Sequence, residues 1–167
     1  MSSEVPLSQS VQRLILLRHA KSCWDNPQLR DHQRPLNKRG RKSAVAVGKE
    51  LAKLGLFPEL VLSSDSERTR ETWSLMEENF PESEVKFLPE LYHSSSSTIS
   101  EIALSNTTDG STIMIIAHNP GCSNALNVLA REYHRFPTGM AACLSKENSE
   151  KLWEIDNLIL PRQLLEK

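Results

Sequence analysis

The hydrophobic positions of this chain fall into short continuous runs separated by segments of helical character. Residues 14–17 and 112–117 have the length and composition of buried strands, 60–62 is a further apolar run, and 85–88 predicts one more strand. Four other segments predict helices, from three- and four-residue apolar steps or from capping signals: 38–54, 64–79, 98–105 and 125–130. After Pro137, apolar segments at 140–144 and 152–155 predict two more strands, joined by a polar turn at 146–150.

Strands that alternate with helices indicate an α/β fold, because each crossover between parallel strands needs a helix that covers the sheet. We therefore expect a three-layer α/β/α sandwich with a mainly parallel central sheet. A chain of 167 residues with 38% hydrophobic content is large enough for one independent core. We expect a single domain over 13–167, after a flexible segment over 1–12.

Three helix ends carry capping signals. Ser64 with Glu67 and Thr98 with Glu101 have the spacing of a capping box, in which the hydroxyl caps the first turn of a helix. Gly55 stands where a glycine closes the helix over 38–54.

Opposite charges are balanced, with 20 Lys and Arg against 21 Asp and Glu. No overall field attracts the chain to nucleic acid or to an anionic membrane, and we expect neither as a partner. The sequence shows no secretory leader and no stretch of about 18 apolar residues that would span a membrane. The expected location is the cytoplasm, with a trimmed organelle-targeting segment as the alternative.

Arginine and histidine side chains follow three of the predicted strands. Arg18 and His19 come after the first strand, Arg68 after the second and His118 after the fourth. In such sheets ligands bind beyond the carboxyl ends of the strands, so these four residues are expected to meet in one site. Guanidinium groups bind phosphate oxygens and neutral imidazole is a nucleophile, which favours phosphoryl transfer through a histidine.

In the mechanism we expect, His19 attacks phosphorus in line and forms a phosphohistidine that water hydrolyses. Arg18, Arg68 and His118 hold the equatorial oxygens, and backbone N–H groups after His118 add donors at a helix N-terminus. The arginines keep His19 unprotonated and neutralise the phosphoryl charge. For this reason no metal and no other cofactor is expected.

Several segments resemble the histidine phosphatase (phosphoglycerate mutase-like) superfamily, and its small SixA-like phosphohistidine phosphatases in particular. The segments that carry this resemblance are LLRHAKSCW at 16–24, DHQRPLNKRG at 31–40, LVLSSDSERTRET at 60–72, IIAHNPG at 115–121 and FPTGM at 136–140. The resemblance implies that His19 is the phosphorylated nucleophile, Arg18 and Arg68 are phosphate ligands, and His118 is the second histidine of the pocket. It covers most of residues 13–163.

The chain also departs from the pattern of the superfamily. Ala20 and Lys21 follow the Arg-His pair where Gly-Glu is more familiar, and Asp65 replaces a proline after Ser-Ser. Asp25 stands where mutase-like members carry asparagine after the tryptophan.

The proton donor to the leaving group is the least defined role. Glu90 lies in the region where many members of the superfamily carry an acid, and we name it as the candidate general acid, with a solvated carboxylate as the alternative. Asn119, beside His118, is the candidate for a further phosphate contact.

Other charged residues have simpler interpretations. Lys21 either extends the positive rim of the site or pairs with Asp25. Arg70 points away from Arg68 on a helix and is expected at the surface. The basic run at 38–42 is read as a solvated helix face that at best helps to dock an acidic partner. His134 and Arg135 follow a helix rather than a buried strand, and we assign them no chemistry.

A zinc site is a rival hypothesis, because Cys23 follows His19 and Cys122 follows His118 at the same spacing of four. Arginines at the same strand ends would repel a dication, so we prefer to read the cysteines as small residues that pack under the pocket. With Cys143 they lack the spacing of a disulfide framework, and we expect reduced thiols.

The sequence therefore predicts a metal-independent phosphatase that acts through a phosphohistidine, with protein phosphohistidine as the leading substrate. One alternative is a phosphatase of small phosphorylated metabolites. The other is a phosphate- or phosphoprotein-binding module without activity on the same fold.

Overall fold

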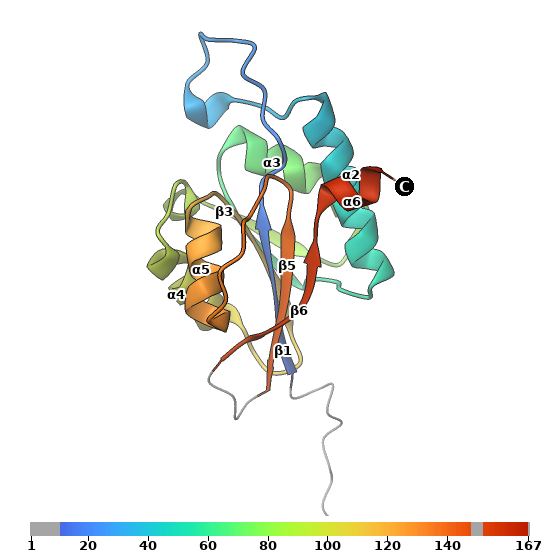
Figure 1. Cartoon of the computed structure of the whole chain (residues 1–167), viewed down its shortest axis with the longest axis vertical. Helices are drawn as coiled ribbons and strands as arrows, with labels where there is room; N and C mark the ends of the chain where they lie inside the picture. Colours follow the sequence, from blue (N-terminus) through green and yellow to red (C-terminus); the bar gives the residue numbers. More distant parts are fainter. Residues whose placement is uncertain (1–10, 148–151, 167) are drawn as a thin grey trace, which may run out of the picture.

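A six-stranded sheet forms the centre of the computed structural model, which describes residues 11–147 and 152–166 (Figure 1). The strands are β1 (Val11–Arg18), β2 (Leu60–Ser64), β3 (Glu84–Leu88), β4 (Thr112–Ala117), β5 (Ala141–Glu147) and β6 (Glu154–Ile159). Their order is β3-β2-β4-β1-β5-β6. Neighbours from β3 to β1 are parallel, and β5 runs antiparallel to both β1 and β6. The predicted, mainly parallel sheet is confirmed.

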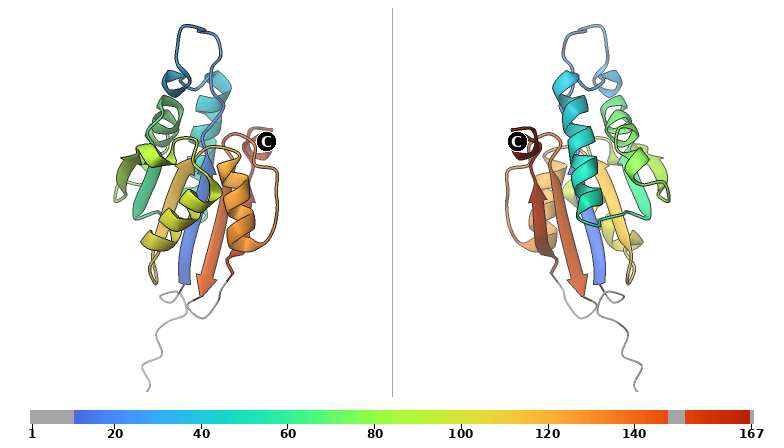
Figure 2. Two further views of the ribbon diagram at one scale, coloured as in Figure 1. Left: turned by 90° about the vertical axis from the view of Figure 1, so that its left-hand side faces the viewer. Right: turned by 90° about the vertical axis from the view of Figure 1, so that its right-hand side faces the viewer.

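Helices cover both faces of this sheet (Figure 2). They are α2 (Lys38–Lys53), α3 (Glu67–Ser74), α4 (Ser96–Asn106), α5 (Gly121–Ala130) and α6 (Pro161–Leu165), with short 3-10 turns η1 (Asp31–Gln33), η2 (Glu77–Asn79) and η3 (Pro89–Leu91). The apolar residues of α4 and α5 belong to one core cluster, and those of α2, α3 and α6 belong to or pack against a second. The molecule is the three-layer α/β/α sandwich that the sequence predicts. No helix in the described residues is long and apolar enough to cross a membrane.

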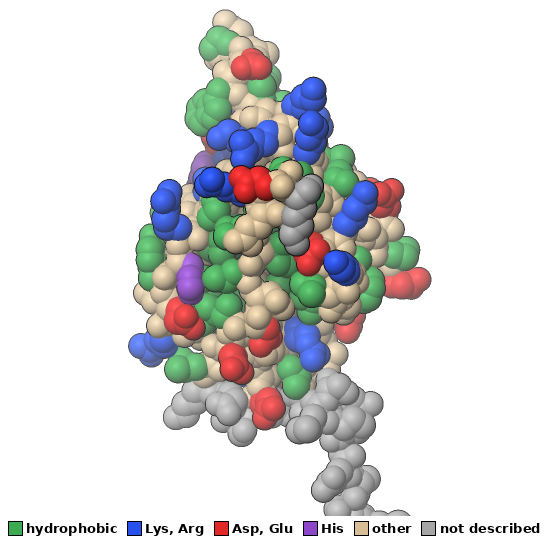
Figure 3. Space-filling model, turned by 45° about the vertical axis from the view of Figure 1, so that its right-hand side comes forward, with side chains coloured by type: hydrophobic (Ala, Val, Ile, Leu, Met, Phe, Trp, Pro, Cys, Tyr) green, Lys and Arg blue, Asp and Glu red, His purple; other side chains and the backbone are tan. Residues whose placement is uncertain are grey.

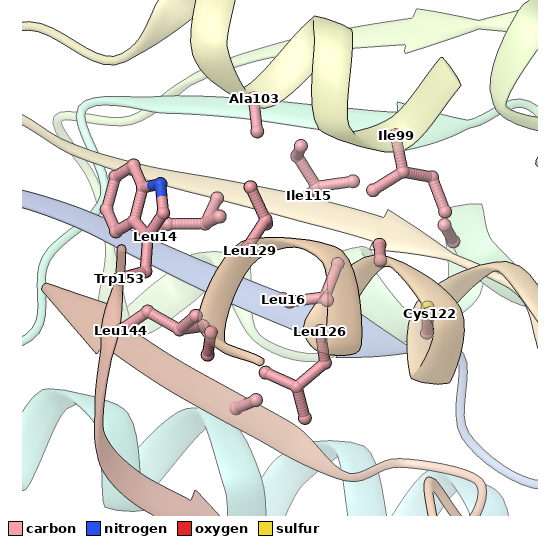
Figure 4. Packing of buried hydrophobic residues seen from close by; sticks show 14 of the residues in the cluster. Leu14, Leu16, Ile99, Ala103, Ile115, Cys122, Leu126, Leu129, Leu144 and Trp153 are labelled. Atoms are coloured by element: carbon pink, nitrogen blue, oxygen red, sulfur yellow. The ribbon is translucent and has the colours of Figure 1, made fainter. Parts of the chain in front are cut away.

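Strand β1 is buried on both faces. Leu14 and Leu16 pack into the cluster under α4 and α5 (Figure 4). Ile15 and Leu17 pack into the cluster under α2. Because successive side chains of a strand point to opposite faces, a continuous apolar run is needed here.

The topology creates a crevice at the carboxyl ends of β1 and β4. These two strands are adjacent, but α2 follows β1 on one face of the sheet and α5 follows β4 on the other. Arg18 pairs with Ala117 in register, and Ser63 pairs with Ile116 of the same strand β4. The residues that follow β1 and β4, and the end of β2, therefore lie at one level of one edge.

The start of α3 differs from the prediction. The helix is capped by the side chain of Ser66, which accepts from the backbone N–H of Thr69, whereas Ser64 is still part of β2. The helix ends at Ser74 rather than at 79, and the chain then turns so that Met76 and Phe80 enter the core.

Two further boundaries are tested by the structure. Helix α4 begins earlier than predicted, because Ser95 rather than Thr98 is its N-cap and accepts from the Thr98 N–H. Gly55 has a φ of 75° just after α2, which confirms its expected place at the end of that helix.

The ends of the chain show smaller differences. Strand β1 begins at Val11, so positions 11 and 12 are not part of a flexible segment, and the rest of the predicted segment lies outside the described residues. Strand β6 begins at Glu154 rather than at 152. The predicted turn at 146–150 lies mainly outside the described residues, and its first two positions belong to β5.

Candidate active site

The loop after β1 is held from two sides. The backbone N–H of Gly139 lies 3.1 Å from the carbonyl oxygen of Arg18 and 2.8 Å from that of His19. Gly139 has a φ of 79°, which favours glycine at this close approach. On the other side, the N–H of Ala20 donates to Oγ1 of Thr72 in α3 at 3.1 Å. The backbone at His19 is therefore fixed before any ligand binds.

The imidazole of His19 has a defined tautomer. Its Nδ1 lies 2.7 Å from the carbonyl oxygen of Ala20. Since a carbonyl oxygen can only accept, Nδ1 carries the proton and Nε2 carries the lone pair. Nε2 faces Nε of Arg68 at 3.3 Å. An imidazole that is unprotonated at Nε2 is the form that can attack phosphorus, and here its lone pair accepts the Nε–H of Arg68.

The surroundings of His19 keep this ring neutral. Burial lowers its pKa from 6.5 to about 3, and the positive charges of Arg68 and Arg18 act in the same direction. The hydrogen bond to Ala20 opposes this effect without cancelling it.

His118 adopts the opposite tautomer. Its Nδ1 lies 3.4 Å from Nη2 of Arg68, which is a donor, so Nε2–H donates to Oγ of Ser64 at 2.8 Å. The rings of His118 and His19 are 5.1 Å apart between centroids. Burial and the neighbouring His19 and Arg68 lower the pKa of His118 to about 2.

Arg68 is anchored by Asp31. Nη1 of Arg68 donates to the carbonyl oxygen of Asp31 at 2.8 Å, and Nη2 donates to Oδ2 at 3.0 Å. Partial burial by itself would raise the pKa of the Asp31 carboxyl, but hydrogen bonds from Tyr92, His93 and Arg68 hold it well below its usual range. A carboxylate that stays charged fixes a guanidinium that is only 2% exposed.

Two other arginines present unused donors. Nη1 of Arg18 donates to the carbonyl oxygen of Phe136 at 2.9 Å, and Nη2 of Arg34 donates to Oγ of Ser22 at 2.9 Å. In the part of the chain that is described, Nε of Arg18 and Nη1 of Arg34 are buried without a hydrogen-bond partner. Nε of Arg34 also makes no hydrogen bond, but it lies 3.4 Å from Oδ1 of Asp31 in an ion pair. Buried donors of this kind indicate an anion site, because polar groups removed from water are normally bonded.

These side chains line a cavity of about 340 Å³ at the predicted edge of the sheet. The structure brings together five of the six predicted site residues: Arg18, His19, Arg68, His118 and Asn119. Oδ1 of Asn119 accepts from the backbone of Ser123 at 3.2 Å, which fixes its amide at the start of α5.

Glu90 does not join this group. It is exposed in η3 and is not part of the cavity wall, because the turn directs Leu91 rather than Glu90 into the core. The geometry therefore does not support Glu90 as the general acid.

Apart from the hydroxyl residues Ser22 and Thr138, four residues of the cavity wall were not predicted from the sequence: Trp24, Asp31, Arg34 and His93. The indole of Trp24 is 75% exposed, and Cζ of Arg34 lies 3.3 Å from the centroid of its ring. Three of the four lie in the segments 16–24 and 31–40 that carry the family resemblance, which is the signal that could have identified them.

Two further charged residues, Lys21 and Arg70, have defined positions relative to the cavity. Lys21 is exposed on its wall and makes no ion pair with Asp25 or any other residue in the described ranges. Arg70 is exposed outside it and donates to the carbonyl oxygen of Asp65 at 2.9 Å. Lys21 thus extends the positive rim, and Arg70 is the surface residue we expected.

The cysteines do not form a metal site in the described residues. Cys122 is completely buried in the hydrophobic cluster under α5, as Figure 4 shows, and Sγ of Cys23 accepts from the backbone of Asp25. No group of three potential ligands in residues 11–147 and 152–166 is arranged to hold a metal ion. All three thiols are free.

A wider groove of about 1100 Å³ adjoins the cavity and shares four lining residues with it: Arg18, Lys21, Asn119 and Thr138. Its wall includes Phe136 and Met140 with basic residues of α2 and α6, among them Arg39 and Arg162. On the face drawn in Figure 3, Lys and Arg side chains gather in the upper part of the molecule, where α2 and α6 lie, above hydrophobic side chains.

Known proteins resemble this chain in sequence and in fold. An uncharacterized chloroplastic protein of Arabidopsis thaliana is 38% identical over 93% of this chain and 81% of its own length. A protein from Agrobacterium tumefaciens, assigned as the phosphohistidine phosphatase SixA, has a TM-score of 0.81 at 29% identity over 90% of this chain and 98% of its own.

More distant structures share the fold. The protein histidine phosphatase SixA in complex with tungstate has a TM-score of 0.80 at 21% identity, over 91% of this chain and 99% of its own. Phosphoglycerate mutases also match, with TM-scores of 0.67 and 0.64, which confirms the predicted phosphoglycerate mutase-like fold.

The family profile described as Histidine phosphatase superfamily (branch 1) matches residues 14–103, more than half of the chain. This stretch contains His19, Asp31 and Arg68, which meet in the cavity. The chain therefore belongs to the histidine phosphatase superfamily, branch 1.

Proposed function

We propose that this protein is a metal-independent phosphatase that transfers the phosphoryl group of its substrate to His19 and then to water. The observation that carries the proposal is the pair formed by the Nε2 lone pair of His19 and the guanidinium of Arg68, 3.3 Å away in a cavity lined by further cations. The superfamily is known here from the sequence match, and the activity is our proposal.

The geometry supports the following steps. Nε2 of His19 attacks phosphorus, while Arg18, Arg68 and the unbonded Nη1 of Arg34 hold the equatorial oxygens. The neutral state of His19 supports this step, because a protonated ring has no lone pair to donate. Water then attacks the phosphohistidine, and inorganic phosphate leaves.

Protein phosphohistidine is the substrate that we propose. The protein from Agrobacterium tumefaciens with the same fold is assigned as a phosphohistidine phosphatase. The groove beside the cavity also supports a large substrate, since its volume of about 1100 Å³ is far more than a phosphoryl group needs. Small phosphate esters and simple phosphate binding are the outcomes that compete with this proposal.

The phosphoenzyme provides the test. Purified protein is incubated in EDTA with a panel of phosphohistidine, phosphoserine and metabolite substrates, and the covalent adduct is trapped by rapid quenching. We expect an acid-labile, alkali-stable adduct that is absent in His19→Ala, and the fastest turnover with phosphohistidine peptides. An acid-stable adduct, activity that survives in His19→Ala or activity lost in EDTA would contradict the mechanism. Fastest turnover of a metabolite would contradict the substrate.

The compartment is a separate part of the proposal. The cytoplasm is the location that we propose, and the chloroplast is the alternative, since the relative from Arabidopsis thaliana is named as chloroplastic. Imaging of the protein with a C-terminal fluorescent tag decides between the two, and a plastid signal would contradict the cytoplasmic location.

A further inference from the structure

His93 occupies an unusual position in the wall of the cavity. Its backbone has a φ of 50°, a left-handed conformation that non-glycine residues rarely adopt. Nε2 of its ring lies 2.9 Å from Oδ2 of Asp31, and its ring centroid lies 4.9 Å from that of His118. Strained backbone at a cavity often marks a functional residue, because the surrounding structure must hold it in place.

The hydrogen bond to Asp31 defines what the ring of His93 can do. A carboxylate can only accept, so Nε2 of His93 carries a proton that it donates to Asp31. Nδ1 has no hydrogen-bond partner among the described residues. The ring therefore has one nitrogen fixed by Asp31 and the other free for a ligand.

The other acids of the region are unsuited to proton donation. Glu90 lies outside the cavity, and the carboxylate of Asp31 is occupied by Arg68, Tyr92 and His93. Nε2–H of His118 donates a hydrogen bond to Ser64, and its Nδ1 accepts one from Arg68. A donor to the leaving group is nevertheless needed for any leaving group more basic than an activated phenol.

We propose that His93, held by Asp31, is the general acid that protonates the leaving group, in place of Glu90. The inference rests on the proposed function and adds a catalytic residue to it. Imidazole is suited to this role, because it is the side chain that commonly gives and takes a proton near neutral pH.

The proton balance of the reaction is then complete. In the first step, Nε2 of His19 forms a bond to phosphorus, the bond from phosphorus to the leaving atom breaks, and that atom keeps the electron pair and takes the Nδ1 proton of His93. In the second step, the neutral Nδ1 removes a proton from water as its oxygen bonds to phosphorus. The bond from phosphorus to His19 breaks, and His93 is protonated again.

Several charged and titratable groups face His93. Asp31 of η1 is hydrogen-bonded to the His93 ring, and Arg68 of α3 is bonded to the same carboxylate oxygen of Asp31. The rings of His118 and Tyr92 lie against that of His93, with centroid distances of 4.9 Å and 4.2 Å. The hydrogen bond to Asp31 holds the orientation of the His93 ring in the wall of the cavity.

The test compares kcat/KM for a series of aryl phosphates whose leaving groups become more basic, from dinitrophenyl to p-nitrophenyl to phenyl phosphate. His93→Gln keeps an N–H that can reach Asp31 but has no acidic proton. We expect a loss of about 100-fold or more with phenyl phosphate and of less than about 3-fold with dinitrophenyl phosphate, because only a poor leaving group needs the acid. The alkaline limb of the pH profile for phenyl phosphate should disappear in the variant.

His32→Gln is the matched control. Nε2 of His32 bonds Oδ1 of Asp65 at 2.9 Å, and its ring also lies against Tyr92, but His32 does not line the cavity. Its kcat/KM should match that of the wild type for every ester. An equal loss for all leaving groups in His93→Gln, or no loss, would overturn the inference and leave the phosphatase activity standing. A wild-type protein that forms no phosphoenzyme and cleaves no ester would overturn the proposed function and the inference together.

Discussion

Nε of Arg68 lies 3.3 Å from Nε2 of His19, and the same guanidinium reaches Nδ1 of His118 at 3.4 Å. A single rigid guanidinium thus spans both imidazoles of the cavity, and Asp31 accepts from two more of its N–H groups. No other side chain type offers donors in this arrangement, since the lysine ammonium is a compact charge on a flexible stem.

This relationship predicts that Arg68→Lys retains the charge and loses the function. We expect kcat/KM for p-nitrophenyl phosphate to fall by about 100-fold or more, as when a single donor to transition-state charge is removed. Arg70→Lys, two residues along the same helix and exposed, should retain the wild-type rate. Steady-state assays of the two variants, with circular dichroism to verify folding, make the comparison. Equal rates for Arg68→Lys and the wild type would contradict the role of the guanidinium.

The two buried histidines predict how stability depends on pH. Both pKa values are lower in the folded protein, to about 3 for His19 and about 2 for His118, than the ordinary 6.5. Below pH 6.5 the unfolded chain therefore binds more protons, and the free energy of unfolding falls as the pH falls toward 3. Each histidine contributes a slope of up to about 1.4 kcal/mol per pH unit, and neither contributes above its ordinary pKa.

Urea unfolding between about pH 4.5 and pH 8 measures this slope, in a range above the ordinary titration of carboxyl groups. Substituting both rings, His19→Asn with His118→Asn, should flatten the curve between about pH 4.5 and pH 6.5. The carboxyl of Asp31, whose pKa is also lowered, adds stability that is lost only below its ordinary value of 3.8. An unchanged slope in the double variant would show that the rings are not held neutral.

Much of the fold could be predicted from the sequence because β1 and β4 are buried on both faces and need continuous apolar runs. Helix ends were less certain for a specific reason. The hydroxyls of Ser63, Ser64 and Ser66 all suit the N-cap of α3. The hydroxyl of Ser64 is bonded to His118, which is distant in the sequence, and Ser66 is the cap. A single hydrogen bond between distant residues leaves no periodic pattern in the sequence.

The residues of the site also differ in whether the sequence could predict them. Arg18 could be placed because it is the last residue of β1, and His19 and His118 because they directly follow β1 and β4, since topology alone brings these strand ends together. Asp31 and His93 belong to loops, whose path over the sheet depends on contacts with each other and with Arg68. Glu90 failed as a candidate because η3 turns its side chain to solvent, and a shift of three residues within one short loop decides which group enters the cavity.

Gly40 predicts a link between packing and catalysis. It lies in the first turn of α2, where its N–H donates to Oδ1 of Asn37 at 2.8 Å, and a Cβ there would overlap the carbonyl oxygen of Lys21. Because that oxygen belongs to the backbone two residues after His19, it cannot move without disturbing the nucleophile loop. We expect Gly40→Ala to lower the free energy of unfolding by about 1–3 kcal/mol and to reduce kcat as well.

Gly48 in the same helix is the matched control. A Cβ at Gly48 would meet Cγ of Met76 at 3.0 Å, Nδ2 of Asn79 at 3.1 Å and the backbone Cα of Met76 at 3.2 Å, and neither residue lines the catalytic cavity. The higher helix propensity of alanine offsets part of these contacts, so Gly48→Ala should change stability by less than about 1 kcal/mol and leave kcat unchanged. Chemical denaturation and initial rates measure both quantities. A Gly40→Ala enzyme with wild-type stability and rate would show that the approach to Lys21 is not required.

The groove beside the cavity predicts a preference for acidic protein segments around the phosphorylated residue. Arg39 and Arg135 are exposed on its wall, and Phe136 forms a buried apolar part of it. A small aryl phosphate reaches only the catalytic cavity, whereas a phosphohistidine peptide extends along this wall. Arg39→Glu with Arg135→Glu should therefore lower kcat/KM for a peptide with acidic flanks by about 3-fold to 10-fold, since exposed charges contribute up to about 1 kcal/mol each.

The loss of kcat/KM in this double variant should shrink at high salt and be much smaller for p-nitrophenyl phosphate. Lys86→Glu makes the same charge change on β3, outside the cavity and the groove, and should leave both substrates unaffected. An equal loss with both substrates, or none with the acidic peptide, would contradict binding of the peptide along the groove.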